Sequence, residues 1–262
     1  MKKALTIAGS DTSGGAGIQA DLKTFHAMDV YGMSALNTLV TMDPDHWSHQ
    51  VHPIPLETVQ AQLDTILSTN VDAMKTGMLS TVEVIECAAD VIERYGVNRA
   101  VIDPVMVCKG ETEVLHPENK EALRNRLVPK ATVVTPNLFE AAQLAEMSTI
   151  TTVEEMKQAA QAIYQLGPKY VLIKGGSGLH HHQAIDLLYD GKEFTTYEAE
   201  KIDTAWTHGA GCTYSAAITA GLAHGKSVPE AVQTAKRFIT LAIQNGFALN
   251  QFVGPVRQMR LK

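Results

Sequence analysis

Short apolar runs alternate with amphipathic stretches along most of the chain. The run at residues 4–8, Ala-Leu-Thr-Ile-Ala, is almost uninterrupted, which is typical of a strand covered on both faces. Similar runs predict strands at residues 35–41, 73–76, 100–104, 132–135 and 170–174. Helical patterns lie between them at residues 57–67, 82–95, 118–127, 138–144 and 153–166. This alternation favours βαβ units, and therefore a parallel sheet with helices on both faces.

The last third of the chain departs from this alternation. Residues 184–189 and 193–197 have the pattern of two strands, and the intervening Asp-Gly favours a tight turn, so we expect a hairpin at the sheet edge. Helices at residues 211–224 and 228–245 complete an α/β fold with a mostly parallel central sheet. A chain of 262 residues with 45% hydrophobic content can bury a large core, and one domain over residues 1–262 is expected.

The composition narrows the range of partners. A net charge of −6 with scattered Lys and Arg argues against nucleic acid or an anionic membrane. No apolar run reaches the roughly 18 residues of a membrane span, and the first residues lead directly into a strand pattern without a signal peptide. The expected location is the cytoplasm.

The cysteine and histidine positions argue against disulfides and against a metal site made of these residues. Cys87, Cys108 and Cys212 are odd in number and not closely paired, which fits reduced thiols better than disulfides or zinc. Residues 180–182 are all histidine, but neighbours on a loop do not converge as helical i, i+4 ligands do. A solvated loop tip is the better interpretation.

A glycine-rich segment follows the first predicted strand. Residues 9–17 read Gly-Ser-Asp-Thr-Ser-Gly-Gly-Ala-Gly, and Ile18, Leu22 and Phe25 then mark one face of a helix. The glycines miss the GxGxxG spacing of dinucleotide-binding folds, and the absence of Gly-Lys-Ser/Thr excludes a Walker-type P-loop.

A second glycine-rich segment, residues 207–213, reads Thr-His-Gly-Ala-Gly-Cys-Thr and precedes a predicted helix. The N–H groups of Gly209, Ala210 and Gly211 can surround an anion at the positive end of that helix. The same environment favours a thiolate at Cys212, which would then be a nucleophile or a base. The alternative is a glycine-rich turn beside a small buried thiol.

Polar residues gather where the predicted parallel strands end. In open parallel sheets this carboxyl edge is where ligands bind, so we expect the functional site there. The residues at these strand ends are Ser10, Asp11, Met42, Asp43, Lys75, Thr76, Gly77, Met78, Asp103, Pro104, Asn137, Glu140, Lys174, Gly175 and Gly176.

Taken in order along nearly the whole chain, these motifs resemble the ribokinase superfamily. The similarity is greatest to its hydroxymethylpyrimidine (phosphate) kinase branch and to the related bacterial cysteine-type pyridoxal kinases. It implies a ribokinase-like fold, a homodimer, and phosphoryl transfer from MgATP to a hydroxymethyl group on a small heteroaromatic ring. The motifs that carry it are residues 9–17, Asp103-Pro104-Val105-Met106, Thr135-Pro136-Asn137-x-x-Glu140, Lys174-Gly175-Gly176 and residues 208–212.

The resemblance also implies roles for individual residues. Gly209, Ala210 and Gly211 would form an anion hole beside the catalytic Cys212, where most sugar kinases of the superfamily carry Asp. Asp103 and Glu140 would bind Mg²⁺, directly or through water. The implied ATP-binding residues are Asn137, Glu140, Lys174, Gly175, Gly176, Ser177, Asp186, Gly211 and Lys236. The implied ring-binding residues are Gly9, Asp11, Gln19, Met42, His49, Gly77, Met78 and Val105.

Some of these residues have a second interpretation. Asn137 follows a proline before a helix, so it is also expected as an N-cap. Glu140 alone would be an ordinary first-turn carboxylate, and His49 could equally be a packing or surface histidine. Cys87 lies on the apolar face of a predicted helix and is expected in the core.

Two departures from typical pyrimidine kinases favour pyridoxal as substrate. Cys108 stands where those enzymes carry a small residue such as Ala, and Met42 stands where many carry Gln or Glu that hydrogen-bonds to the aminopyrimidine. Our hypothesis is that Cys212 deprotonates the hydroxyl or holds the aldehyde as a hemithioacetal, while Cys108 closes over the site as a second acid–base group. The alternative for Cys108 is a small buried hydrophobe.

The sequence thus predicts a kinase for pyridoxal, pyridoxine and pyridoxamine that also accepts hydroxymethylpyrimidine. The alternative closest to this is a dedicated hydroxymethylpyrimidine/hydroxymethylpyrimidine-phosphate kinase of thiamine biosynthesis. A non-catalytic binder of nucleotide or vitamin is disfavoured by the combination of Cys212, Glu140 and Lys174. The fold alone would also allow a sugar kinase, which Cys212 and the loop around Asp11 argue against.

Overall fold

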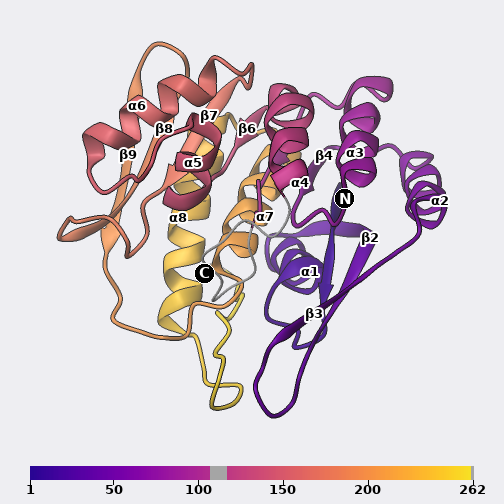
Figure 1. Cartoon of the computed structure of the whole chain (residues 1–262), viewed down its shortest axis with the longest axis horizontal. Helices are drawn as coiled ribbons and strands as arrows, with labels where there is room; N and C mark the ends of the chain where they lie inside the picture. The colour runs from indigo at the N-terminus through magenta and orange to yellow at the C-terminus, as the bar shows by residue number, and fades with distance from the viewer. Residues whose placement is uncertain (107–116, 261–262) are drawn as a thin grey trace.

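The computed structural model describes residues 1–106 and 117–260, and within them nine strands form one sheet (Figure 1). The order across the sheet is β3-β2-β1-β4-β5-β6-β7-β8-β9. The six strands from β2 to β7 in this order are parallel, and β3 and the β8–β9 hairpin lie antiparallel at opposite edges. The predicted parallel sheet and edge hairpin are confirmed. The strands are β1 (Lys2–Asp11), β2 (Val30–Met42), β3 (His49–Pro53), β4 (Ala73–Thr76), β5 (Ala100–Ile102), β6 (Val133–Val134), β7 (Tyr170–Lys174), β8 (Gln183–Tyr189) and β9 (Phe194–Glu200).

Helices cover both faces of the sheet, as predicted (Figure 1). Helices α2 to α6 pack on one face, and α1, α7 and α8 pack on the other. The predicted helix at residues 118–127 changes form along its length, because α4 is followed by a π-helical turn at Leu123–Leu127 and a 3₁₀ turn at Val128–Lys130. The α-helices are α1 (Gly17–Ala27), α2 (Leu56–Leu67), α3 (Val82–Arg94), α4 (Pro117–Ala122), α5 (Leu138–Ala145), α6 (Val153–Tyr164), α7 (Ala210–Ala223) and α8 (Val228–Gln244).

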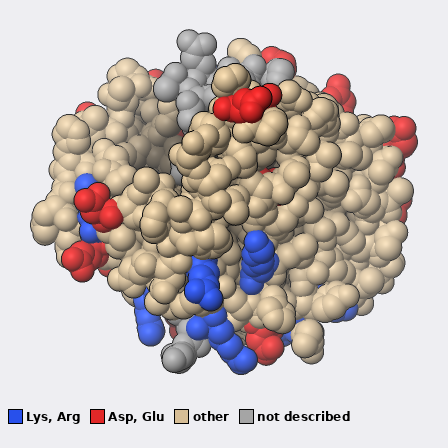
Figure 2. Space-filling view, turned by 90° about the horizontal axis from the view of Figure 1, so that it is seen from below, with Lys and Arg blue, Asp and Glu red and all other residues tan. Residues whose placement is uncertain are grey.

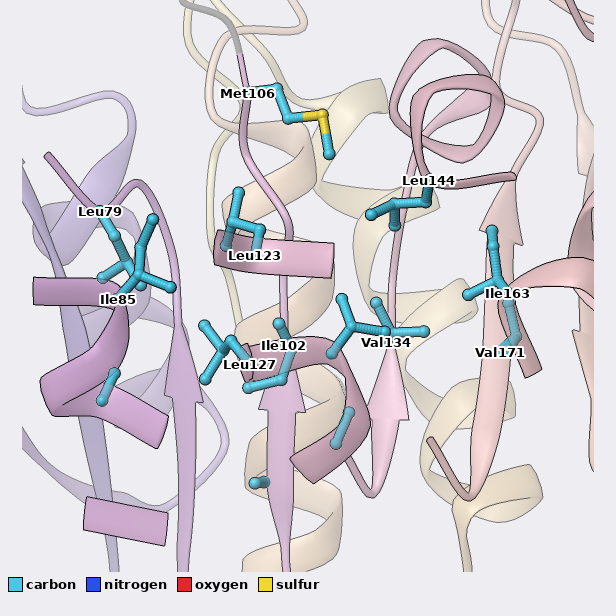
Figure 3. Close-up of a cluster of buried hydrophobic side chains, with 14 of the residues drawn as sticks. Leu79, Ile85, Ile102, Met106, Leu123, Leu127, Val134, Leu144, Ile163 and Val171 are labelled. Carbon is cyan, nitrogen blue, oxygen red and sulfur yellow. The ribbon is translucent and has the colours of Figure 1, made fainter. Parts of the chain in front are cut away.

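Successive strand residues contribute to opposite layers of the core. Val171 packs into the cluster under α2 to α6, whereas Leu172 packs into the cluster under α1, α7 and α8. Figure 3 shows the first cluster, where Ile102 and Val134 from the strands meet Leu127 from the turn after α4. Two covered faces explain why the strand sequences are nearly continuous apolar runs.

Strand β3 is not predicted by the sequence. It pairs antiparallel with β2, with His49 opposite Met42 and Pro53 opposite Thr38. Four of its five residues are exposed, so its sequence has no apolar alternation that would mark a strand. The connection between the two strands carries Trp47, whose ring stacks on Phe252 near the C-terminus with 5.9 Å between the ring centroids.

The outer surface carries charges of both signs. On the face in Figure 2, Lys and Arg side chains lie in a few small groups separated by uncharged surface. Within residues 1–106 and 117–260, no helix is both long enough and apolar enough to cross a bilayer.

Candidate active site

A pocket of about 410 Å³ opens at the carboxyl edge of the parallel strands, where the sequence places its polar clusters. Two segments form much of its wall. We call residues 9–17, from the end of β1 to the start of α1, the ring loop, and residues 209–212, Gly209 with the first residues of α7, the anion loop. The pocket is lined by Gly9, Ser10, Asp11, Ala16, Gly17, Val40, Met42, His49, Met78, Asp103, Val105, Asn137, Glu140, Lys174, Thr207, His208, Gly209, Ala210, Gly211 and Cys212.

The anion loop is shaped by Gly209, which has a left-handed backbone with φ of 77°. A Cβ at this position would overlap the carbonyl oxygen of Gly15 in the ring loop, so only glycine lets the two loops touch. Helix α7 begins directly afterwards, and its first N–H groups have no partner within the helix. A Cβ on Gly211 would lie 3.6 Å from Nζ of Lys174. The loop therefore offers N–H donors beside an ammonium group, which suits a phosphate.

Cys212 lies half-buried in the first turn of α7, and it lines the pocket. Burial raises the pKa of its thiol to about 11, although the charge of Lys75 and the N–H of Gly17 act in the opposite direction. The negative charges of Asp21 and Asp103 raise it further. The expectation of a thiolate is therefore wrong, because burial outweighs the charge of Lys75 and the hydrogen bond from Gly17.

Lys174 is held at the pocket by Asp103, with Nζ and Oδ1 2.9 Å apart. Ser215 on α7 donates to the other carboxylate oxygen of Asp103 at 3.0 Å, and Thr135 donates to Oδ1 at 3.3 Å. Burial acts to lower the pKa of Lys174, but the charges of Asp103 and Glu140 outweigh burial and raise it. Lys174 therefore presents a fixed positive charge to whatever occupies the anion loop.

Asn137 and Glu140 form a capping box at the start of α5. The N–H of Glu140 donates to Oδ1 of Asn137 at 2.9 Å, and the N–H of Asn137 donates to Oε2 of Glu140 at 2.8 Å. The expected N-cap is confirmed. Burial raises the pKa of Glu140 to about 7, with Lys174 opposing the shift and Asp103 adding to it. The carboxyl group thus keeps its proton to a higher pH than an ordinary glutamate does.

The predicted magnesium ligands, Asp103 and Glu140, line the same pocket. Among the described residues, no group of three or more His, Cys, Asp or Glu is arranged to hold a metal ion. Mg²⁺ in nucleotide enzymes commonly uses one or two carboxylates together with waters and phosphate oxygens, so this pair fits it. Both oxygens of Asp103 already accept hydrogen bonds from protein donors, which favours contact through water.

The structure divides the predicted ring-binding residues into two groups. Gly9, Asp11, Met42, His49, Met78 and Val105 line the pocket. Gln19 and Gly77 are not among the lining residues. Gln19 instead supports the ring loop, because its side chain accepts from the N–H of Asp11 and donates to Oγ of Ser10.

Asp11 has a structural task in the ring loop. Its carboxylate accepts from the N–H groups of Ser13 and Ala16, each at 2.8 Å, and from Nε2 of His208 at 2.7 Å. Burial works against its charge, but the hydrogen bonds from His208 and Ser13 outweigh burial and lower its pKa to about 2. Asp11 is therefore ionised throughout the physiological range.

Several predicted ATP-binding residues lie beyond the pocket lining. Asp186 on β8 accepts from the N–H of Gly175 at 3.2 Å and from Nζ of Lys236 at 2.7 Å. Lys236 also donates to the carbonyl oxygen of Ala184. The structure thus brings Gly175, Asp186 and Lys236 together, as a buried ion pair next to the end of β7. Gly176 and Ser177 follow in the same connection, and Cys108 lies outside the described residues.

The sequence alone assigns no role to His208, Ser215 or the buried pair Lys75–Asp21. His208 and Lys75 stand within motifs that the sequence marks as functional, which is the available signal. Their partners are 197 and 54 positions away, so spacing does not identify the pairs.

Comparison with known proteins agrees with the geometry. The phosphomethylpyrimidine kinase family matches residues 11–257. A pyridoxine kinase of Bacillus subtilis (strain 168) is 58% identical over 264 residues, covering 100% of this chain and 97% of the relative. A hydroxymethylpyrimidine/phosphomethylpyrimidine kinase of the same organism is 42% identical over 261 residues, covering 99% and 96%.

A solved structure of a related kinase has the same fold. The pyridoxal kinase from Staphylococcus aureus in complex with AMP-PCP and pyridoxal superposes with a TM-score of 0.93 at 51% identity, covering 98% of this chain and 93% of that one. The ribokinase-like fold expected from the motifs is thereby confirmed. With a family match over almost its full length, the chain belongs to the phosphomethylpyrimidine kinase family.

Proposed function

We propose that this protein is an ATP-dependent kinase that phosphorylates the hydroxymethyl group of pyridoxal, pyridoxine and pyridoxamine, and also accepts hydroxymethylpyrimidine. One observation carries the proposal: Cys212, the anion loop and Lys174 line one pocket of about 410 Å³ together with most of the residues expected to bind the ring. The higher identity to a pyridoxine kinase than to a hydroxymethylpyrimidine/phosphomethylpyrimidine kinase supports this choice of substrate.

The residues of the pocket can carry out phosphoryl transfer without a covalent protein intermediate. Such transfer depends on positioning and on neutralising the charge of the moving phosphoryl group. The N–H groups of residues 209–212 would hold its oxygens, and Lys174 would add a positive charge oriented by Asp103. Asp103 and Glu140 would hold Mg²⁺, which neutralises phosphate charge when bound.

Cys212 would face the hydroxyl group of the substrate. Because its pKa is about 11, the sulfur is protonated at neutral pH. A loose phosphoryl-transfer transition state needs little help from a base, so a thiol that holds the hydroxyl in line is sufficient to start the reaction. A base role for Cys212 requires that bound substrate lowers the pKa of the thiol. The accompanying role of Cys108 stays a hypothesis.

Met42 in the wall of the pocket supports a preference for pyridoxal. Met42 lies in that wall, and its thioether is a weak acceptor for the amino group of an aminopyrimidine. A homodimer and a cytoplasmic location stay predictions that follow from the family resemblance and the sequence.

The test is ADP release with MgATP and four alcohols offered separately: pyridoxal, pyridoxine, pyridoxamine and hydroxymethylpyrimidine. We expect turnover on the three B6 alcohols, with the phosphate ester identified by mass spectrometry. Cys212→Ala should lower kcat by about 10²-fold, the scale on which a misplaced reacting group acts, because the hydroxyl is no longer held in line. Cys87→Ala, on the core-facing side of α3, is the matched thiol control and should keep the parental rate.

Other outcomes identify the alternatives. Turnover confined to hydroxymethylpyrimidine and its monophosphate would identify a dedicated thiamine-pathway kinase. Thermal stabilisation by ATP and pyridoxal without any ADP release would indicate a binding protein.

A further inference from the structure

We propose that Asp11 and His208 are a positioning pair that sets the ring loop against the anion loop, and so aligns the acceptor hydroxyl with the phosphate. The inference rests on the proposed function, because it concerns the same reaction. Neither residue needs to touch a reacting atom for this role.

Asp11 organises the ring loop from within. It stands at the end of β1, and its carboxylate holds the N–H groups of Ser13 and Ala16. These two hydrogen bonds fix the turn that leads into α1. The same carboxylate reaches across to Nε2 of His208, so a single group connects the turn to the other loop.

The main chain of His208 is hydrogen-bonded to the segment at residues 254–256. Its N–H donates to the carbonyl oxygen of Gly254 at 3.1 Å, and its carbonyl oxygen accepts from the N–H of Val256 at 3.0 Å. The side chain is 9% exposed, and a Cβ on Gly15 would overlap its ring. The residue that follows is Gly209, the first of the anion loop. Any shift of His208 is therefore passed directly to the N–H groups that would hold the phosphate.

The hydrogen bonds argue for positioning rather than for substrate contact. The Asp11 carboxylate already accepts three hydrogen bonds from the protein, and a buried carboxylate that loses a partner is strongly unfavourable. Without the pair, the ring loop would still bind the ring of the acceptor, and the anion loop would still bind the phosphate. The distance and angle between hydroxyl and phosphate would change, and a misplacement of about 1 Å can lower a rate by about 10²-fold.

The test compares His208→Leu with His208→Gln. Leu removes the donor, whereas the amide of Gln can donate to the same carboxylate. We expect His208→Leu to lower kcat by about 10- to 100-fold with both KM values within about threefold of the parent, and His208→Gln to recover most of kcat. His224→Leu is the control, because His224 bonds to the carbonyl oxygen of Met28 at the far end of α7. Its kcat should stay within about twofold.

Three results would overturn the inference: a parental kcat in His208→Leu, an equal loss of kcat in the Leu and Gln variants, or an effect confined to KM.

Hydrogen exchange separates this inference from the proposed function. If the parent phosphorylates none of the alcohols, the proposed function fails, yet the amides of residues 12–16 should still exchange faster in His208→Leu than in the parent and in His208→Gln. Unchanged exchange in His208→Leu would overturn the pair in that case.

Discussion

Lys75 and Asp21 form an ion pair that is completely buried between the sheet and the helices α1 and α7, with Nζ and Oδ1 2.8 Å apart. The second carboxylate oxygen of Asp21 accepts from the hydroxyl of Thr6 at 2.6 Å. Nζ of Lys75 lies 3.5 Å from the position that a Cβ on Gly77 would take, just behind the pocket. Charged pairs in such a place contribute little net stability, but the loss of one partner is costly.

Lys75→Met should therefore destabilise the protein by about 3–5 kcal/mol, because it leaves the Asp21 carboxylate buried without its counter-charge. The double variant Lys75→Met/Asp21→Asn removes both charges and keeps an acceptor for Thr6, so it should recover most of that loss. Urea unfolding of the parent, both single variants and the double variant measures this cycle. If the double variant is as unstable as the sum of the single variants, the two residues are not coupled.

The ammonium group of Lys75 should also control the reactivity of Cys212. Its charge lowers the pKa of the thiol, which burial has raised to about 11. Alkylation of Cys212 by iodoacetamide should rise about tenfold per pH unit from pH 7 to 10, since only the thiolate reacts. In Lys75→Met, at a pH where the variant is folded, alkylation should be slower. Peptide mass spectrometry separates Cys212 from Cys87 and Cys108, and a plateau near pH 8 would contradict a raised pKa.

The apolar pattern is sufficient to predict the layered fold, because each strand is covered on two sides and Val171 and Leu172 each need a partner cluster. The capping box of Asn137 and Glu140 is also predictable, since both groups lie within one turn. Strand β3 is mostly exposed and has no apolar pattern, so it could not be predicted in this way.

Features that depend on three-dimensional burial could not be predicted. The anion-loop motif suggests a thiolate at Cys212, and only the folded surroundings reveal that desolvation reverses the sign of the pKa shift. Likewise, the Asp11–His208 pair joins residues 197 positions apart, and a single sequence contains no signal for such a contact.

Gly209→Ala should lower kcat by about 10²-fold or more, the scale on which loss of an oxyanion donor acts. The added methyl group would collide with Gly15 and displace the N–H donors. Gly225→Ala is the matched control: Gly225 also has a positive φ, 85°, but a Cβ added there would have no atom within 4 Å. The control should lose about 1–2 kcal/mol of stability and keep the parental kcat. Similar kinetics in the two variants would mean that the contact between the loops is unimportant.

Glu140 should make stability fall as the pH rises. Its pKa is about 7 in the folded protein and 4.5 ordinarily, so between these values the folded state binds more protons than the unfolded state. The stabilisation is complete below about pH 4.5 and is lost as the pH rises through 7. Urea unfolding from pH 5 to 8, without Mg²⁺ or ATP, should show this decline in the parent. Glu140→Gln keeps an acceptor for the N–H of Asn137 but cannot ionise, and an equally steep decline in this variant would assign the effect to another group.

Met42→Gln should shift the substrate preference toward the pyrimidine. Met42 lies in the pocket wall beside His49, its partner across β2 and β3. A Gln amide can accept from the amino group of hydroxymethylpyrimidine, which the thioether does poorly, and one well-placed hydrogen bond changes discrimination by about tenfold. The ratio of kcat/KM for hydroxymethylpyrimidine to that for pyridoxal should therefore rise by about tenfold. Met42→Leu, which removes the sulfur without adding an acceptor, should leave the ratio within about twofold, so a rise in both variants would assign the preference to pocket shape instead of hydrogen bonding.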